Sequence, residues 1–149
     1  MEWNVYLSGE IHSNWRDLIK EKFISLDLPI YFSNPETDHE LSDDCGEKIL
    51  GSEKNKFWRD HKSAKINAIK TKILLEQADI VIVYFGEKYK QWNAAFEAGY
   101  ASALSKPLII IHGNENQHAL KEVDASALAV AKNIDEAIDI LKYTISGSS

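Results

Sequence analysis

Apolar residues along the chain gather in short runs that alternate with segments of helical spacing. Two runs, 80–85 and 107–112, are nearly continuous Ile, Val and Leu, which is typical of strands covered on both faces of a parallel sheet. A third run, 3–7, opens the chain, and shorter runs lie at 28–32 and 128–131. The pattern therefore predicts five strands.

Helical spacing fills the segments between these strands. Residues 13–26, 61–77, 94–104 and 134–145 each place apolar side chains three and four positions apart, and Ser13 is a candidate cap of the first helix. Strand alternating with helix predicts an α/β fold, since crossovers between parallel strands place helices on both faces of the sheet. We expect a three-layer, doubly wound, mainly parallel five-stranded sheet of flavodoxin-like or Rossmann-like type, with a flavodoxin-like strand order.

The chain of 149 residues fits one domain, which we expect to span 1–145, with 146–149 as a flexible tail. The connection 33–60 is far longer than the usual ~2–6 residues, which indicates a functional segment. Residues 36–47 carry six acids and no base, whereas 53–72 carry seven bases and two acids. A solvated loop followed by a solvated helix face explains this pattern, and a lid over a ligand, with basic residues near a phosphate, is the alternative.

Composition narrows the function classes. The net charge of −6 argues against binding of a nucleic-acid polymer by the whole surface, but not against one small phosphorylated ligand. A single cysteine, Cys45, excludes an intramolecular disulfide. The first residues lack the pattern of a signal peptide, and the apolar run 80–85 is far below the ~20 residues that span a bilayer. We expect a cytoplasmic protein without a membrane partner.

Ligands of open α/β sheets bind beyond the carboxyl ends of the strands, and three such ends carry a glycine here. They are Gly9, Gly86 and Gly113. Turns alone also account for these glycines. The chain has no G-x-G-x-x-G after its first strand, no P-loop motif and no G-x-S-x-G, which disfavours dinucleotide, P-loop and hydrolase-elbow sites.

Two polar patterns offer further candidate sites. The helix 61–77 carries, beside its Ile stripe, a small polar stripe that suits a pocket wall or a simple boundary with solvent; its members are Asp60, Ala64, Asn67 and Thr71. The acidic segment 36–47 offers possible metal ligands, but turn-forming Asp residues in a solvated loop explain it better; these ligands are Asp38, His39, Asp43, Asp44 and Cys45. These ligands leave a metal-dependent hydrolase as the weakest of three hypotheses for the function, and the other two are given below.

Glu97 is an unusual carboxylate, because it lies in a helix of small and apolar residues. A carboxylate among alanines is unfavourable to bury without a partner, so Glu97 either faces water or serves chemistry. The small residues around it allow close packing of the helix on the sheet. Near the start of this helix, the helix dipole favours the ionised form.

The run 94–107, AAFEAGYASALSKP, resembles the signature of the nucleoside 2-deoxyribosyltransferase superfamily, in which the Glu is the nucleophile. The opening VYLSG and the run QADIVIV at 77–83 are similar to the first strand with its ligand loop and to the third strand of that superfamily. Within it, the chain most resembles the YtoQ family. The segments that carry this closer likeness are YLSGEIHS at 6–13, TDHE at 37–40, SDDCG at 42–46, FWRDHK at 57–62 and YKQWNAAF at 89–96.

The resemblance implies an α/β enzyme, a transferase or hydrolase, that cleaves or transfers the N-glycosidic bond of a nucleoside or nucleotide without a metal or organic cofactor. Glu97 would attack the anomeric carbon, Tyr6 would orient Glu97, and Trp92 or Trp58 would stack on a base. The expected substrate-binding residues are Ser8, Gly9, Glu10, His12, Asp60, Asn67, Gln91, Trp92 and Asn93. It also implies a homodimer or a higher homo-oligomer, because relatives often complete the site with a neighbouring subunit.

At two positions the chain departs from the superfamily pattern. Thr71 stands where the transferases usually carry an Asp, and Gln91 stands where they often carry an Asp or Ser that holds the sugar or a phosphate. Thr71 cannot act as an acid near neutral pH, and Gln91 can only hydrogen-bond. The second hypothesis is therefore a non-catalytic nucleotide-binding or sensor domain that retains the fold and the pocket. By contrast, Asp79 is predicted to be structural, binding backbone donors ahead of a buried strand.

Overall fold

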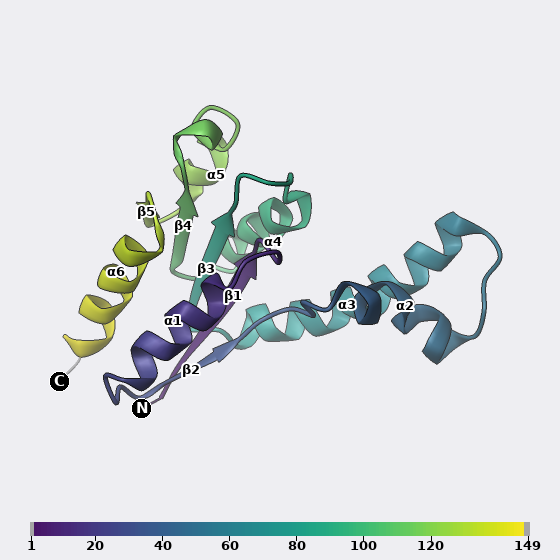
Figure 1. The fold of residues 1–149 in the computed structure, drawn as a ribbon, viewed down its shortest axis with the longest axis horizontal. Coiled ribbons are helices and arrows are strands. Elements are labelled where there is room, and N and C mark those ends of the chain that lie inside the picture. Colours follow the sequence, from purple (N-terminus) through teal and green to yellow (C-terminus); the bar gives the residue numbers. More distant parts are fainter. Residues whose placement is uncertain (1, 148–149) are drawn as a thin grey trace. The chain divides into compact units, whose positions relative to one another are not determined.

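The computed structural model describes residues 2–147, and their contacts divide them into two compact units (Figure 1). The sheet unit comprises the described residues up to Ser33 and from Ala78 onward, and the hairpin unit comprises Asn34–Gln77. Each unit is described by itself. The prediction of one domain over 1–145 stays a prediction. Of the predicted tail, residues 148 and 149 lie outside the described residues, and Ser146 belongs to the last helix.

The sheet unit is built on five parallel strands. They are β1 (Trp3–Gly9), β2 (Ile30–Ser33), β3 (Ile80–Phe85), β4 (Leu108–His112) and β5 (Ala129–Ala131). Their order across the sheet is β2-β1-β3-β4-β5, and every neighbouring pair is parallel. The predicted flavodoxin-like order is thereby confirmed.

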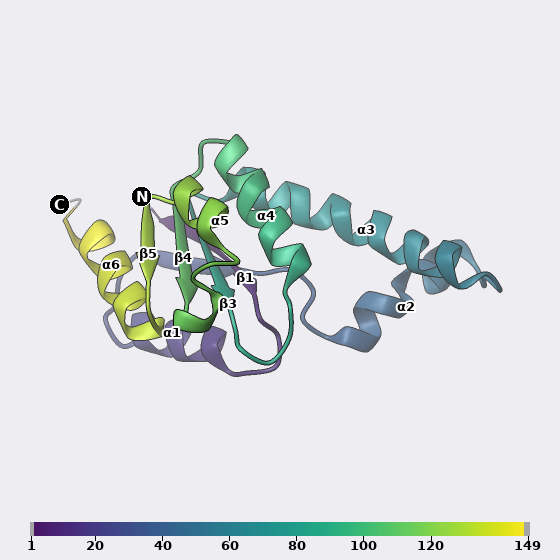
Figure 2. The same ribbon diagram turned by 90° about the horizontal axis from the view of Figure 1, so that it is seen from above.

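Helices cover both faces of this sheet (Figure 2). The longer ones are α1 (Trp15–Ile24), α4 (Trp92–Ala103) and α6 (Ile134–Ser146), and the shorter ones are α5 (Lys121–Ser126) and the 3-10 helix η1 (Asn114–Asn116). Helices α1 and α6 pack together on one face, whereas α4 and α5 pack together on the other. The predicted three-layer α/β class is confirmed.

Strand alternation divides the buried side chains between these two faces. On the α1 and α6 face, Val5 and Leu7 of β1 join an apolar core with Trp15, Ile19 and Phe23 of α1. On the α4 face, β1 instead presents Asn4, Tyr6 and Ser8, all buried. The polar side of β1 therefore faces the helix that carries Glu97.

One local expectation for the sheet unit was wrong, and two short helices were not expected. Ser13 does not cap α1, because its hydroxyl donates to the Glu10 carboxylate instead. The cap position is Asn14, whose side chain makes no capping hydrogen bond. The elements η1 and α5 were not expected at all. Neither contains a buried residue, so neither produces the apolar spacing by which a helix is recognised.

The hairpin unit consists of α2 (His39–Leu50) and α3 (Lys56–Gln77). The acidic segment was expected as a loop, and that expectation was wrong, because Asp38 caps α2 by accepting a hydrogen bond from the backbone N–H of Leu41 at 3.1 Å. Gly46 lets the helices approach closely: an added Cβ would lie 2.5 Å from the backbone nitrogen of Ser63. The hydroxyl of Ser63 accepts from the Gly46 N–H at 3.0 Å.

No helix in the described part of the chain combines the length and apolarity that crossing a membrane requires.

Candidate functional site

The carboxylate of Glu97 lies on the sheet-facing side of α4, opposite the polar side of β1. Its side chain is buried, with 8% relative exposure. The hydroxyl of Ser8 donates to Oε2 of Glu97 at 2.5 Å, and the hydroxyl of Tyr6 donates to the same oxygen at 3.2 Å. Within residues 2–147, the other oxygen, Oε1, accepts no hydrogen bond from a side chain or the backbone. The two oxygens of Glu97 therefore differ, because Oε2 accepts two hydrogen bonds and Oε1 accepts none within residues 2–147.

The local sequence explains this convergence. Tyr6 and Ser8 are two residues apart on a strand, so they point to the same face. On α4, Ala94, Ala98 and Ala101 are buried with Glu97, and their small side chains let the helix approach the sheet. Glu97 therefore does not face water. Its carboxylate is buried and hydrogen-bonded.

Burial raises the pKa of Glu97 above the usual 4.5, while the hydrogen bonds from Ser8 and Tyr6 and the positive charge of Arg16 lower it. The net direction is upward. A carboxylate whose ionised form is disfavoured by desolvation yet held by two hydroxyls and a nearby cation is typical of functional sites.

The β1–α1 loop lies at the carboxyl end of β1, directly after Ser8. Gly9 has a φ of +118°, and the Glu10 N–H donates to the carbonyl of Tyr84 at 2.9 Å. The Glu10 carboxylate accepts hydrogen bonds from the backbone of His12 and from the N–H and hydroxyl of Ser13, the latter two at 3.1 and 2.5 Å. The Glu10 carboxylate thus stabilises its own loop through these hydrogen bonds. Its contact with a substrate stays a prediction.

Arg16 was missed by the sequence analysis. Its guanidinium is buried and donates to three carbonyls at the end of β1: Leu7 at 3.2 Å, Gly9 at 3.2 Å and Glu10 at 2.6 Å. The signal was available, because Arg16 shares the spacing of the buried stripe with Ile19 and Phe23. A charged residue at a core position of a helix is itself a reason to look for a role.

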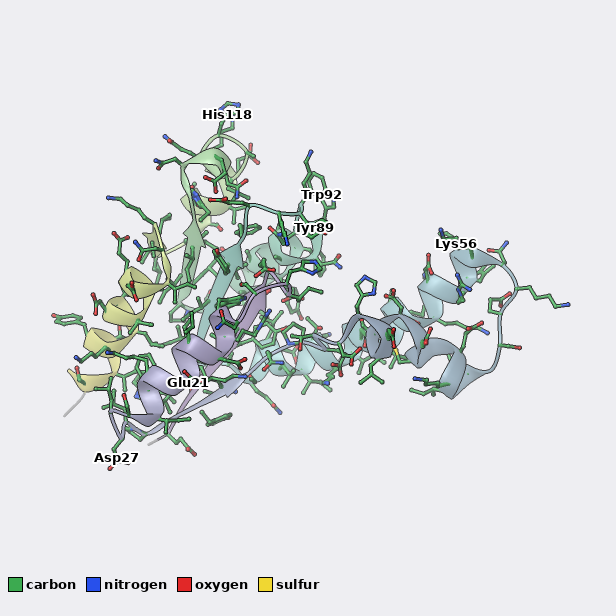
Figure 3. All side chains as sticks on the ribbon, in the orientation of Figure 1. Glu21, Asp27, Lys56, Tyr89, Trp92 and His118 are labelled. Carbon is green, nitrogen blue, oxygen red and sulfur yellow. The ribbon has the colours of Figure 1, made fainter. Side chains whose placement is uncertain are left out.

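The β3–α4 loop carries the other predicted residues of the sheet unit. The rings of His12 and Tyr89 lie 4.5 Å apart, which joins this loop to the β1–α1 loop. Figure 3 labels Tyr89 and Trp92, which mark the loop and the first turn of α4. Trp92 and Asn93 are exposed. Within the described chain, Nε2 of Gln91 is buried without a hydrogen-bond partner.

Asp60 and Asn67 belong to the hairpin unit, and their predicted contact with substrate stays a prediction. Asp60 is exposed, whereas the amide of Asn67 donates to the carbonyl and hydroxyl of Ser42, both at 3.0 Å. In α2, His39 lies 2.9 Å from Asp43. Among residues 2–147, no three His, Cys, Asp or Glu side chains gather as a metal site would require.

One structural expectation near the site is met. Asp79 accepts from the Asn4 N–H at 2.8 Å, which confirms its structural role.

At the end of β4, His112 is buried, with Nδ1 2.7 Å from the Gly113 carbonyl and Nε2 2.9 Å from Asp124. Since both ring nitrogens face acceptors, the protonated imidazolium fits this place best. Burial lowers the pKa of His112, but Gly113, Asp124 and Glu115 outweigh it and the pKa is raised.

We expect the stability contribution of His112 to depend on pH. Because its folded pKa lies above the usual 6.5, the contribution is complete below that value and is lost as pH rises through the folded pKa. His112→Asn should therefore lower the free energy of unfolding more at about pH 6 than at about pH 9, as measured by urea unfolding. The control is His118→Asn, because His118 is an exposed histidine on the connection that follows β4. An equal loss at both pH values in His112→Asn contradicts the prediction.

The two hydroxyls on Glu97 should contribute unequally. Ser8→Ala and Tyr6→Phe each remove one charge-assisted hydrogen bond, worth roughly 1.5–3 kcal/mol, so each should shift the Glu97 titration to higher pH. The shorter Ser8 contact predicts the larger shift for Ser8→Ala. Carboxyl-detected NMR of the two variants measures it, and an unchanged titration in both would contradict the observed geometry.

The flavodoxin-like sheet thus places a buried glutamate of α4 against two hydroxyl groups of β1. Residues 6–145 match the family model described as "Nucleoside 2-deoxyribosyltransferase YtoQ", and the chain belongs to this family. It is 50% identical over 143 residues to the uncharacterized protein YtoQ of Bacillus subtilis (strain 168), covering 96% of this chain and 97% of that protein.

Solved structures agree in fold. A conserved protein from Enterococcus faecalis V583 superposes with a TM-score of 0.63 at 13% identity, covering 97% of this chain and 99% of that one. A 2-deoxyribosyltransferase from Bacillus psychrosaccharolyticus superposes with a TM-score of 0.53 at 16% identity, covering 91% and 90%.

Proposed function

We propose that the protein cleaves or transfers the N-glycosidic bond of a nucleoside or nucleotide, with Glu97 as nucleophile. The observation that carries this proposal is the asymmetry of the Glu97 carboxylate, in which Oε2 accepts from Tyr6 and Ser8 and Oε1 accepts no hydrogen bond within residues 2–147. Membership of the family supports the substrate class.

In the first step, Oε1 of Glu97 attacks the anomeric carbon of the sugar. The bond from that carbon to the base nitrogen breaks, and the base leaves with the electron pair and takes a proton from water. In the second step, water or an acceptor base attacks the same carbon, the ester bond to Glu97 breaks, and the attacking group loses its proton. The sequence follows that of retaining glycosidases.

The hydroxyls of Tyr6 and Ser8 keep the carboxylate in one orientation during attack and stabilise it when it leaves. Gln91 supports a further contact, since its buried Nε2 has no partner in the described chain and an unpaired buried donor is unfavourable. A sugar hydroxyl or a phosphate oxygen would accept from it. Thr71 stands where the transferases usually carry an Asp, which is why the leaving base takes its proton from solvent in this scheme.

The test is turnover. Purified protein is incubated with deoxynucleosides, ribonucleosides and their monophosphates, with and without an acceptor base, and the products are separated by chromatography. Free base or a new nucleoside supports the proposal. A ligand-dependent rise in melting temperature without product would support the binding or sensor function instead, because ligand binding to the native state stabilises it.

We also propose that the protein forms a homodimer or a higher homo-oligomer. The support is an exposed aromatic surface on the β3–α4 loop and α4, where Trp92 and Phe96 are each 73% exposed and Tyr89 is 58% exposed. Large exposed aromatic side chains on one short segment are typical of interaction surfaces. Sedimentation equilibrium at micromolar concentration should give a multiple of the 16.9 kDa chain mass, and a monomer at all concentrations contradicts the proposal.

A further inference from the structure

Arg16 is a buried cation that takes part in no ion pair among residues 2–147. Its relative exposure is 7%, and none of the ion pairs in the described chain includes it. Burying a charge is unfavourable unless it is paired and hydrogen-bonded. The carbonyls of Leu7, Gly9 and Glu10 each accept one hydrogen bond from its three nitrogens, but carbonyls do not neutralise its charge.

The three carbonyls are placed around the residue that binds the nucleophile. Leu7 and Gly9 are the immediate neighbours of Ser8, and the Ser8 hydroxyl donates to Glu97. The guanidinium itself is held, because its Cζ lies 4.6 Å from the centroid of the Trp15 ring and the Trp15 Nε1–H donates to the same Glu10 carbonyl at 2.7 Å. A planar fork with several donors suits this task, whereas an ammonium group does not.

We propose that Arg16 is a positioning residue of the site: it holds the end of β1 so that Ser8 meets Glu97. The inference deepens the proposed function, on which its catalytic consequence rests. The charged and titratable groups that act on Glu97 from the elements packed against it are Tyr6 of β1 and Arg16 of α1. Those that act on Arg16 are Glu10, Tyr6, Glu97 and Asp17.

The charge serves both halves of the proposed reaction. Glu97 must be ionised to attack, and the burial that disfavours its ionised form is opposed by Arg16. In the second step the same carboxylate is the leaving group, and a carboxylate of lower basicity leaves more readily. The guanidinium acts through Glu97 and the end of β1, and touches no substrate itself in this scheme.

The test is a titration that requires no substrate. Carbon-13 NMR follows the side-chain carboxyl of Glu97, identified by the signal that disappears in Glu97→Gln. In Arg16→Met the Glu97 midpoint should move to higher pH, because the cation is lost. In Arg16→Lys it should move up by less than in Arg16→Met, because the charge is kept although the planar fork that holds the end of β1 is lost. Lys22→Met removes an exposed cation from the same helix and should leave the midpoint unchanged.

An unchanged Glu97 midpoint in Arg16→Met, or a shift as large in Arg16→Lys, overturns the proposal. So does loss of folding in both variants, checked by urea unfolding, since Arg16 would then serve the fold alone. If the enzyme turns over nucleosides, kcat/KM of Arg16→Met on the acid side should fall by about tenfold for each unit that the midpoint moves. A loss of equal size at all pH values contradicts the charge role. Absence of turnover in wild type refutes the proposed function and leaves the titration standing as the test of Arg16.

Discussion

Glu97→Gln should reduce N-glycosidic bond cleavage by at least about 10³-fold, because removal of a covalent nucleophile leaves only binding and orientation. Gln keeps the size of the side chain and can still accept from Ser8 and Tyr6, but its amide cannot form the glycosyl ester. The measurement is kcat/KM on whichever nucleoside or nucleotide the wild type turns over. In the wild type, the rate should also fall as pH drops through the raised pKa of Glu97.

The same substitution should not harm folding. The pKa of Glu97 is raised in the folded state, so its contribution to stability is present at low pH and is lost as pH rises through the folded pKa. Glu97→Gln cannot ionise and should therefore be at least as stable as wild type at neutral pH. Such a gain of stability with a loss of activity is typical of a functional residue.

Glu87→Gln is the matched control, because Glu87 is an exposed glutamate on the β3–α4 loop. It should keep the wild-type rate and stability. Equal turnover by Glu97→Gln and wild type would remove Glu97 from the mechanism, and loss of both activity and folding in Glu97→Gln would show that the carboxylate is needed for the structure.

The strands could be predicted from the sequence because the apolar pattern of each one lies within a few consecutive residues. The strands β3 and β4 are buried almost throughout, so residues 80–85 and 108–111 each form a nearly continuous apolar run. The helix α2 could not be predicted in the same way, since Gly46 is its sole buried residue within the described chain. Its helical form depends on the Asp38 cap and on contacts with Ser63, which is 17 residues away along the chain.

The site residues likewise differ in whether the sequence could indicate their roles. Glu97 stood out as a lone carboxylate among alanines, whereas the roles of Tyr6 and Ser8 were expected from the resemblance to the deoxyribosyltransferases. The role of Arg16 could not be deduced, because it depends on backbone carbonyls that a helix and a strand bring together only in the folded sheet. Likewise, Glu10 was expected to meet the substrate, but a hydrogen-bonding pattern confined to residues 10–13 occupies its carboxylate.

Gly9→Ala should destabilise the protein by about 3 kcal/mol or more, because two independent effects oppose the added methyl group. The φ of Gly9 is +118°, a region that residues with a Cβ rarely adopt. An added Cβ would also lie 2.0 Å from the carbonyl oxygen of Tyr84 and 2.7 Å from its nitrogen. Those atoms belong to the backbone of β3, which pairs with Gly9, so relief requires β1 and β3 to separate.

The separation would act on chemistry as well as on folding. Gly9 follows Ser8 directly, and its carbonyl is one of the three that Arg16 holds, so any Gly9→Ala protein that folds should show a weakened Ser8–Glu97 contact and reduced kcat. Gly99→Ala is the matched control: Gly99 lies within α4, and a Cβ added there would meet no atom within 4 Å beyond the backbone of its own helix and its chain neighbours. It should stabilise the protein by roughly 0.5–1 kcal/mol, the usual helix preference for Ala over Gly. Urea unfolding of the two variants separates the cases, and equal stability of Gly9→Ala and wild type would contradict the close approach of β1 and β3.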